Sequence, residues 1–306
     1  MSESAAVIGV IVPGYPHPLL RPEGNPAWAS IRRAYEEIAR TLEELEIERL
    51  LFYSTQWFSI LGHQVQAFPR PKWIHVDQEF HELGSMPYDF QVDVPFSNLY
   101  VQCGLDRKLH IRTTAYDGFP IDTGTIVANQ LLNPRNLPFS AISCNMYADR
   151  AETIVLGKAA RDAIERSGKR TAVVAVTSLS NRLHTKIVAD KDDHISSQMD
   201  DEWNRKLLEL LAEGRLEDVS QLARTFSHQA HADNKLKAIW WLAATMGQDN
   251  RYKGAVHAYG PIYGSGSAVI SLLPVKHAVG GHEFDEDDVD VFGGDKEVLQ
   301  TTINAY

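Results

Sequence analysis

A protein held together by a disulfide framework is excluded first, because the sequence has only two cysteines, Cys103 and Cys144. Two thiols are too few for the disulfide framework of small secreted proteins. No stretch approaches the ~18 consecutive apolar residues of a membrane span. The start of the chain, residues 1–4, has no basic segment of the kind that opens a secretory signal. We therefore expect two reduced core thiols in a cytoplasmic protein without a membrane partner.

Basic residues are also too few for some functions. The sequence has 30 Lys and Arg against 40 Asp and Glu, a formal net charge of −10. Nucleic acids and anionic membranes both demand a basic face, so neither is expected as the main partner. Acidic residues gather near the end of the chain, with six between positions 283 and 290. We predict one domain over residues 1–275 and a solvated acidic tail over residues 276–306.

Short apolar and β-branched runs predict the strands of a buried sheet, at 6–12, 49–53, 109–112, 139–144, 171–176, 255–258 and 268–273. Apolar residues at three- and four-residue steps predict helices at 28–45, 151–167, 200–213, 216–228 and 234–246. The order strand, helix, strand up to residue 53 is a βαβ unit. The predicted fold is a single α/β domain whose mostly parallel, mixed central sheet is flanked by helices. Residues 62–96 show no sustained period and are expected to be irregular, with short strands.

Three loops that follow predicted strands carry polar residues, at 13–18, 54–57 and 177–181. Open α/β sheets bind ligands where such loops meet at one edge. Asp122 precedes a helix expected to start near Thr123, so it is predicted to cap that helix, although a pairing with Asp117 as acid and base is the functional alternative.

Two further features have competing interpretations. The Gly-rich segment 264–266 precedes a strand instead of opening a helix, which favours a tight turn over a phosphate cradle. The adjacent Trp240 and Trp241 are expected to serve either the core or a subunit contact, since aromatic residues are enriched in both.

Four groups of residues carry a family resemblance, at 53–57, 116–126, 201–205 and 259–266. Together they resemble the class III extradiol ring-cleavage dioxygenases, and among these the two-subunit 2-aminophenol 1,6-dioxygenases. The resemblance extends over roughly residues 6–273. It implies a fold built to hold non-heme Fe(II) by two His and a carboxylate. In the two-subunit members, an iron-bearing β subunit pairs with a related α subunit that lacks iron.

The resemblance places the functional positions of the family on residues that cannot perform that chemistry. Gly14 and Gln56 stand where the two ligand His are expected, and Ala255 or a neighbour stands at the carboxylate position. Asn181 stands at the catalytic His, and Thr123 where some members have an active-site His. This pattern implies a degenerate, iron-free site. The implied function is a non-catalytic subunit that supports a related catalytic β subunit in an α2β2 oligomer, with Fe(II) only in that partner.

Two alternatives stay open at this point. His17, His63 and His257 lie in or beside the same loops and would form a relocated metal site if they converged; otherwise they are loop histidines satisfied by backbone groups or water. The first alternative is a stand-alone enzyme with this relocated metal site, or with a metal-free site, near His17, Gln56, Asn181 and His257. The second alternative is a binding protein for a small aromatic molecule. The candidate pocket residues are His17, Gln56, Trp57, His63, Asp122, Thr123, Asn181, His184, His257 and Tyr259.

Overall fold

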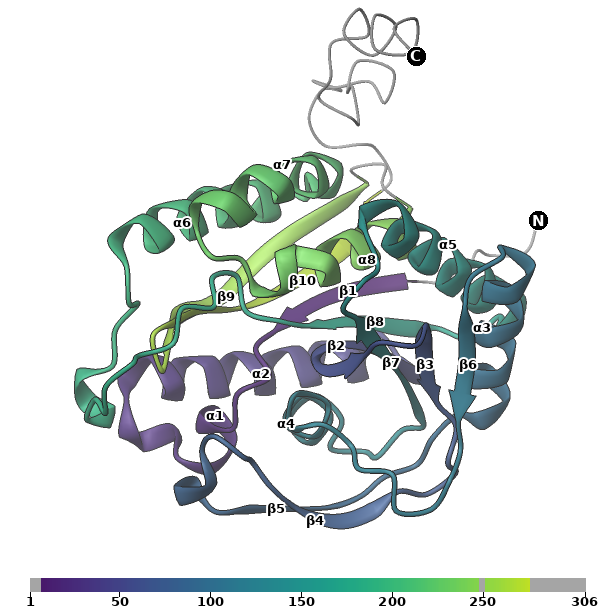
Figure 1. Cartoon of the computed structure of the whole chain (residues 1–306), viewed down its shortest axis with the longest axis horizontal. Coiled ribbons are helices and arrows are strands. Elements are labelled where there is room, and N and C mark those ends of the chain that lie inside the picture. The colour runs from purple at the N-terminus through teal and green to yellow at the C-terminus, as the bar shows by residue number, and fades with distance from the viewer. Residues whose placement is uncertain (1–6, 248–250, 276–306) are drawn as a thin grey trace, which may run out of the picture.

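A computed structural model describes residues 7–247 and 251–275, so the predicted acidic tail lies outside the described residues. The centre is an eight-stranded sheet in the order β6-β3-β7-β2-β8-β1-β10-β9 (Figure 1). Its strands are β1 (Val7–Val12), β2 (Arg49–Ser59), β3 (His63–Gln66), β6 (Ile111–Thr114), β7 (Phe139–Asn145), β8 (Thr171–Val176), β9 (Tyr252–Ile262) and β10 (Ser265–Pro274). A separate two-stranded sheet consists of β4 (Lys72–Val76) and β5 (Ser85–Asp89).

The sheet is mixed, as predicted. Strands β1, β8, β2 and β7 are parallel neighbours, whereas β10 pairs antiparallel with both β1 and β9. Strand β3 is antiparallel to β7 and parallel to β6. Strand β8 lies between β1 and β2, so the two strands of the predicted βαβ unit are parallel but not adjacent. The carboxyl ends of β1, β8 and β2 therefore meet at one edge of the sheet.

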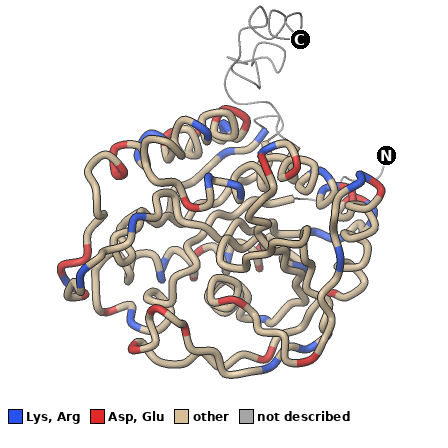
Figure 2. Tube along the Cα trace, viewed as in Figure 1, with Lys and Arg blue, Asp and Glu red and all other residues tan. Residues whose placement is uncertain are grey.

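Helices cover both faces of the sheet (Figure 1). One face carries α3 (Val94–Asp106), α5 (Arg150–Ser167), α6 (Gln198–Ala212), α7 (Leu216–Gln229) and α8 (Lys237–Met246). The other carries α2 (Pro26–Glu44), α4 (Thr123–Leu132), the short α1 (His17–Leu20) and the β4–β5 hairpin. The central strands are almost free of charged residues, which lie on the surrounding helices and loops (Figure 2).

Strand β8 shows why the sheet is covered on both faces. Val173 and Ala175 belong to the core on one side, whereas Ala172, Val174 and Val176 belong to the core on the other. Successive side chains of a strand point to opposite faces, so an uninterrupted apolar run requires two apolar layers.

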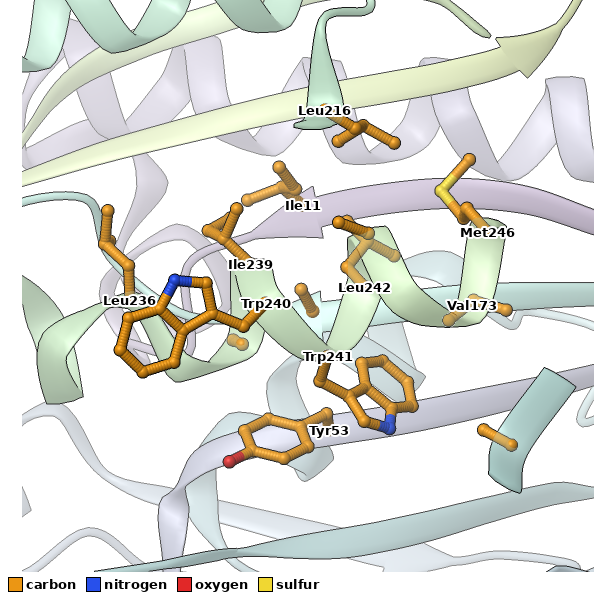
Figure 3. Packing of buried hydrophobic residues seen from close by; sticks show 14 of the residues in the cluster. Ile11, Tyr53, Val173, Leu216, Leu236, Ile239, Trp240, Trp241, Leu242 and Met246 are labelled. Atoms are coloured by element: carbon orange, nitrogen blue, oxygen red, sulfur yellow. The ribbon is translucent and has the colours of Figure 1, made fainter. Parts of the chain in front are cut away.

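The two tryptophans of α8 are part of the core, which is one of the two roles expected for them. Trp240 and Trp241 are buried, and Trp241 lies beside Tyr53 of β2 (Figure 3), with ring centroids 5.2 Å apart. Each indole N–H is satisfied internally: Trp240 donates to the Ser220 carbonyl at 2.9 Å, and Trp241 to the Tyr100 hydroxyl at 3.0 Å. The cysteines are free and buried, as expected of core thiols.

Helix α3 and strand β2 differ from the prediction, and strand β9 is longer than predicted. Helix α3 was not expected, because its polar and apolar residues do not separate into two faces; Asp93 caps it by accepting from the Phe96 amide at 3.1 Å. Strand β2 continues through the predicted loop 54–57 to Ser59, with a shift in its register against β7 between Ser54 and Phe58. Such a bulge re-aims side chains at the end of a strand, and here it turns Gln56 and Trp57 to the edge where β1 and β8 end.

Candidate functional site

A cavity of about 850 Å³ lies at the edge where β1, β2 and β8 end. Residues that line it include Gly14 after β1, Gln56 and Trp57 of β2, Asn181 after β8, and Asp233. The β4–β5 hairpin and the start of α4 contribute further walls. The location is the one expected for a site in an open α/β sheet.

Gly14 leaves no room for a larger side chain at the first expected ligand position. A Cβ atom there would lie 2.8 Å from the Cα of Gly124, 2.9 Å from Nε2 of Gln56 and 3.0 Å from Cγ1 of Val176. Contacts below 3.0 Å require something to shift, and the Gly124 Cα is backbone. The space that a histidine would need at position 14 is therefore taken by α4 and by the Gln56 amide.

Asp233 lines the cavity and accepts more hydrogen bonds than the other residues described here. The sequence analysis did not predict it as a site residue. Its Oδ2 atom receives the Thr55 hydroxyl at 2.7 Å, the Thr177 hydroxyl at 2.9 Å and the Ser178 amide at 3.0 Å. Its Oδ1 atom receives side-chain amide N–H groups at 2.8 Å and 3.3 Å. The carboxylate is buried and joins strands β2 and β8 to the segment between α7 and α8.

The backbone beside Asp233 is strained. Asn234, Lys235 and Leu236 all have positive φ angles, of 43°, 59° and 58°. Non-glycine residues rarely adopt this left-handed region, and three in succession are costly. The Asp233 hydrogen bonds therefore hold in place a turn that the local sequence does not favour.

The Asn181 side chain is held by hydrogen bonds to Tyr15 and Asp233. Its Oδ1 atom accepts from the Tyr15 hydroxyl at 2.5 Å, and its Nδ2 atom donates to Asp233 Oδ1 at 3.3 Å. Burial, and secondarily the Asp233 carboxylate, raise the pKa of Tyr15 far above its ordinary value, so the phenol stays protonated. A neutral amide in this position orients its neighbours but cannot exchange protons as a histidine would.

The start of α4 closes another side of the cavity. Asp122 caps the helix as predicted, by accepting from the Thr125 amide at 3.0 Å, and it also accepts from the Ser54 hydroxyl at 2.5 Å. The Thr123 hydroxyl donates to Asp77 at 2.5 Å and, having one proton, accepts from Nε2 of His75 at 2.7 Å. These bonds tie the β4–β5 hairpin to the helix. Asp117 is exposed and takes no part in them.

The three histidines of the alternative metal site do not converge. His17 packs between Trp28 and Phe80, with ring centroids 4.6 Å from each. His63 pairs with Glu152 at 2.9 Å, and His257 contacts Ser271 at 2.8 Å and Glu37 at 3.3 Å. Each ring is thus directed to its own structural neighbours, and none lines the cavity. Within residues 7–247 and 251–275, no group of three or more His, Cys, Asp or Glu is arranged to hold a metal ion.

The remaining candidates divide by location. Ala255 is exposed and pairs with Ser271 of β10. It does not line the cavity, although the carboxylate of the family is expected at this residue or a neighbour. Strand β9 extends from Tyr252 to Ile262, longer than predicted, so Ala255 lies within the strand and not in a loop at its end. His184 contacts Asp193 at 3.0 Å, and Tyr259 donates to Asp201 at 2.6 Å, both outside the cavity. The predicted residues that do line it are Gln56, Trp57, Asp122, Thr123 and Asn181.

Sequence features that would have located Asp233 are few. It follows a helix and precedes the strongly apolar α8, which is a common place for a polar turn. The charge was not distinctive among 40 acidic residues. Only the fold brings it to the loops after β2 and β8.

The protein is an open α/β protein with a cavity at the carboxyl ends of its parallel strands. Residues 15–270 match the family described as the catalytic LigB subunit of aromatic ring-opening dioxygenase, and the chain belongs to this family. Within the described residues, none of the helices combines the length and apolar character required for crossing a membrane.

Two relatives from Pseudomonas sp are similar to the chain over nearly their whole length. The 2-aminophenol 1,6-dioxygenase alpha subunit is 35% identical over 269 residues, which cover 87% of this chain and 98% of the relative. The beta subunit of the same name is 31% identical over 295 residues, covering 90% and 96%. A crystal structure of the uncharacterized protein JW3007 from Escherichia coli K12 has the same fold, with a TM-score of 0.61, 13% identity and coverage of 87% and 99%.

Proposed function

We propose that this chain is the non-catalytic, iron-free subunit of a two-subunit extradiol dioxygenase that opens 2-aminophenol or a related aromatic ring. In this role it binds and stabilises a related, iron-bearing β-type chain in an α2β2 oligomer. The higher identity to the alpha subunit than to the beta subunit supports this choice.

The donor set of the cavity carries the proposal. A non-heme Fe(II) dioxygenase site needs two His and a carboxylate on one face of the metal, with open positions for substrate and O₂. The cavity is lined by Gly14 and Gln56, where the resemblance implies the two ligand His, and by Asn181, where it implies the catalytic His. The oxygens of Asp233 are engaged by five hydrogen-bond donors. The residues present therefore do not fit Fe(II), and we derive no step of ring cleavage from them.

Co-expression with a β-type chain from the same source tests the proposal. We expect the two chains to elute together in size-exclusion chromatography and the shared peak to cleave 2-aminophenol, whereas this chain alone does not. The β-type chain purified alone should be less stable and less active, because its partner surface is then exposed. Separate elution with no change in the activity of the β-type chain would refute the proposal.

A further inference from the structure

A ridge of exposed apolar side chains lies beside the cavity, at the end of β2 and on the segments that follow β2, β6 and β7. We call it the apolar ridge. It consists of Phe58 (52% exposed), Ile60 (60%), Leu61 (70%), Tyr116 (61%), Met146 (56%) and Tyr147 (81%). Four of them, Phe58, Ile60, Leu61 and Tyr116, line one shallow groove. The Met146 amide donates to the Ser59 carbonyl at 2.9 Å, which places the other two beside this groove.

The backbone beneath the ridge is held by buried polar contacts. Lys237 is 5% exposed, and its ammonium donates to the carbonyls of Asn145 at 2.7 Å and Met146 at 2.9 Å. The Ser59 hydroxyl donates to the Gly62 carbonyl at 2.8 Å, and the Tyr147 amide donates to Asn145 Oδ1 at 2.9 Å. The apolar side chains thus stand on fixed backbone, and a fixed surface loses less conformational freedom on binding.

The area of the ridge is large enough to form most of one side of a stable interface. Large side chains that are more than half exposed offer on the order of 100 Å² each, so the six side chains of the ridge present roughly 600 Å² of largely apolar surface. This is the upper end of the range for the largest apolar patch on an ordinary monomer, about 300–600 Å². A standard interface buries about 800 Å² on each partner. The ridge therefore supplies about three quarters of one side of a standard subunit contact.

We infer that the apolar ridge is the surface on which the β-type chain docks. This inference rests on the proposed function, which supplies a partner of the same family. Phe58 lines both the groove under the ridge and the cavity, and the β4 side chains Trp73 and Ile74 are exposed at the cavity wall. A partner seated on the ridge lies next to the mouth of the cavity, so docking also narrows access to it.

The test uses the full chain with its β-type partner and two substitutions on highly exposed residues, Leu61→Asp and Tyr147→Asp. Each places a carboxylate in a surface that should become buried, and we expect each to weaken the complex by about tenfold or more in a sedimentation or titration assay. Ile187→Asp is the matched control, because Ile187 is 98% exposed but lies outside the ridge. It should change the affinity by no more than about twofold.

Protein quality is checked by melting temperature, which should stay within about 2 °C for each isolated variant because the replaced side chains are exposed. As a readout that needs no variant, amide exchange at residues 58–62 and 145–147 of the wild-type chain should slow on complex formation. A wild-type complex that both ridge variants form with unchanged affinity would overturn the ridge and leave the proposed function intact. Failure of the wild-type chains to associate would overturn both. Self-association that the ridge variants abolish, with the heteromeric complex unaffected, would assign the ridge to a second copy and overturn the inference.

Discussion

Replacing Asp233 with alanine should lower the free energy of unfolding by roughly 3 kcal/mol, because it removes the shared acceptor of five buried or half-buried donors and leaves the Ser178 amide without that partner. The Thr55 and Thr177 hydroxyls and the Ser178 amide would each lose their carboxylate partner. The left-handed turn at residues 234–236 would lose the contacts that hold it. Urea unfolding at pH 7.5, followed by circular dichroism, measures the change.

Two comparisons make this result specific to the Asp233 network. Asp233→Asn keeps one acceptor oxygen and the size of the side chain, so it should destabilise the fold by less than alanine does. Asp162→Ala is the control, because it removes a carboxylate that accepts two hydrogen bonds from Arg107 at the protein surface. Surface ion pairs contribute at most about 1 kcal/mol. A loss for Asp233→Ala no larger than that for Asp162→Ala would show that the network does not hold these loops together.

Acidification should destabilise the wild-type chain through His17. Burial lowers the pKa of this histidine to about 4, against the opposing effect of Asp193 and Asp190. Its Nδ1 atom is buried without a hydrogen-bond partner among the described residues. The unfolded chain takes up the proton near pH 6.5, whereas the folded chain does so only near pH 4. Stability is thus fully present above about pH 6.5 and falls as the pH drops towards 4, by roughly 2 kcal/mol between pH 7.5 and 5.

The variant His17→Phe isolates this contribution. Phenylalanine fills the same aromatic surroundings of Trp28 and Phe80 and cannot be protonated. Its free energy of unfolding should therefore fall less than that of the wild type between pH 7.5 and 5. His194→Gln, at an exposed histidine, should keep the wild-type pH dependence. Equal slopes for the wild type and His17→Phe would contradict the assignment to His17.

The apolar strands and the Asp122 cap were predictable because their causes are local. Residues 171–176 form the predicted strand β8, since six apolar or β-branched residues in succession suit a position between two apolar layers. Asp122 caps α4 because its carboxylate reaches an amide only three residues away. The two-residue turn before β10 follows from the left-handed backbone at Tyr263 and Gly264.

The composition of the cavity was only partly predictable because it depends on distant parts of the chain. Gln56 and Asn181 follow neighbouring strands and were correctly placed at the cavity. Asp233 reaches the same place only through the packing of α8, which no local pattern reveals. Ala255 was misplaced because the length of β9, and with it the register against β10, could not be derived from the apolar run alone. His17, His63 and His257 lie on three different elements, α1, β3 and β9, and each contacts different neighbours.

The most direct test of the account is the iron content of each chain after an active complex has been assembled, separated and analysed. The account predicts iron in the β-type chain only, with none above background in this chain, because Gly14 and Gln56 stand where the two ligand His are expected and supply no adequate ligand set. Ring cleavage should disappear when that iron is removed and return when Fe(II) is restored to the β-type chain. Stoichiometric iron bound to this chain, lost when Gln56 or Asp233 is replaced, would contradict the central claim.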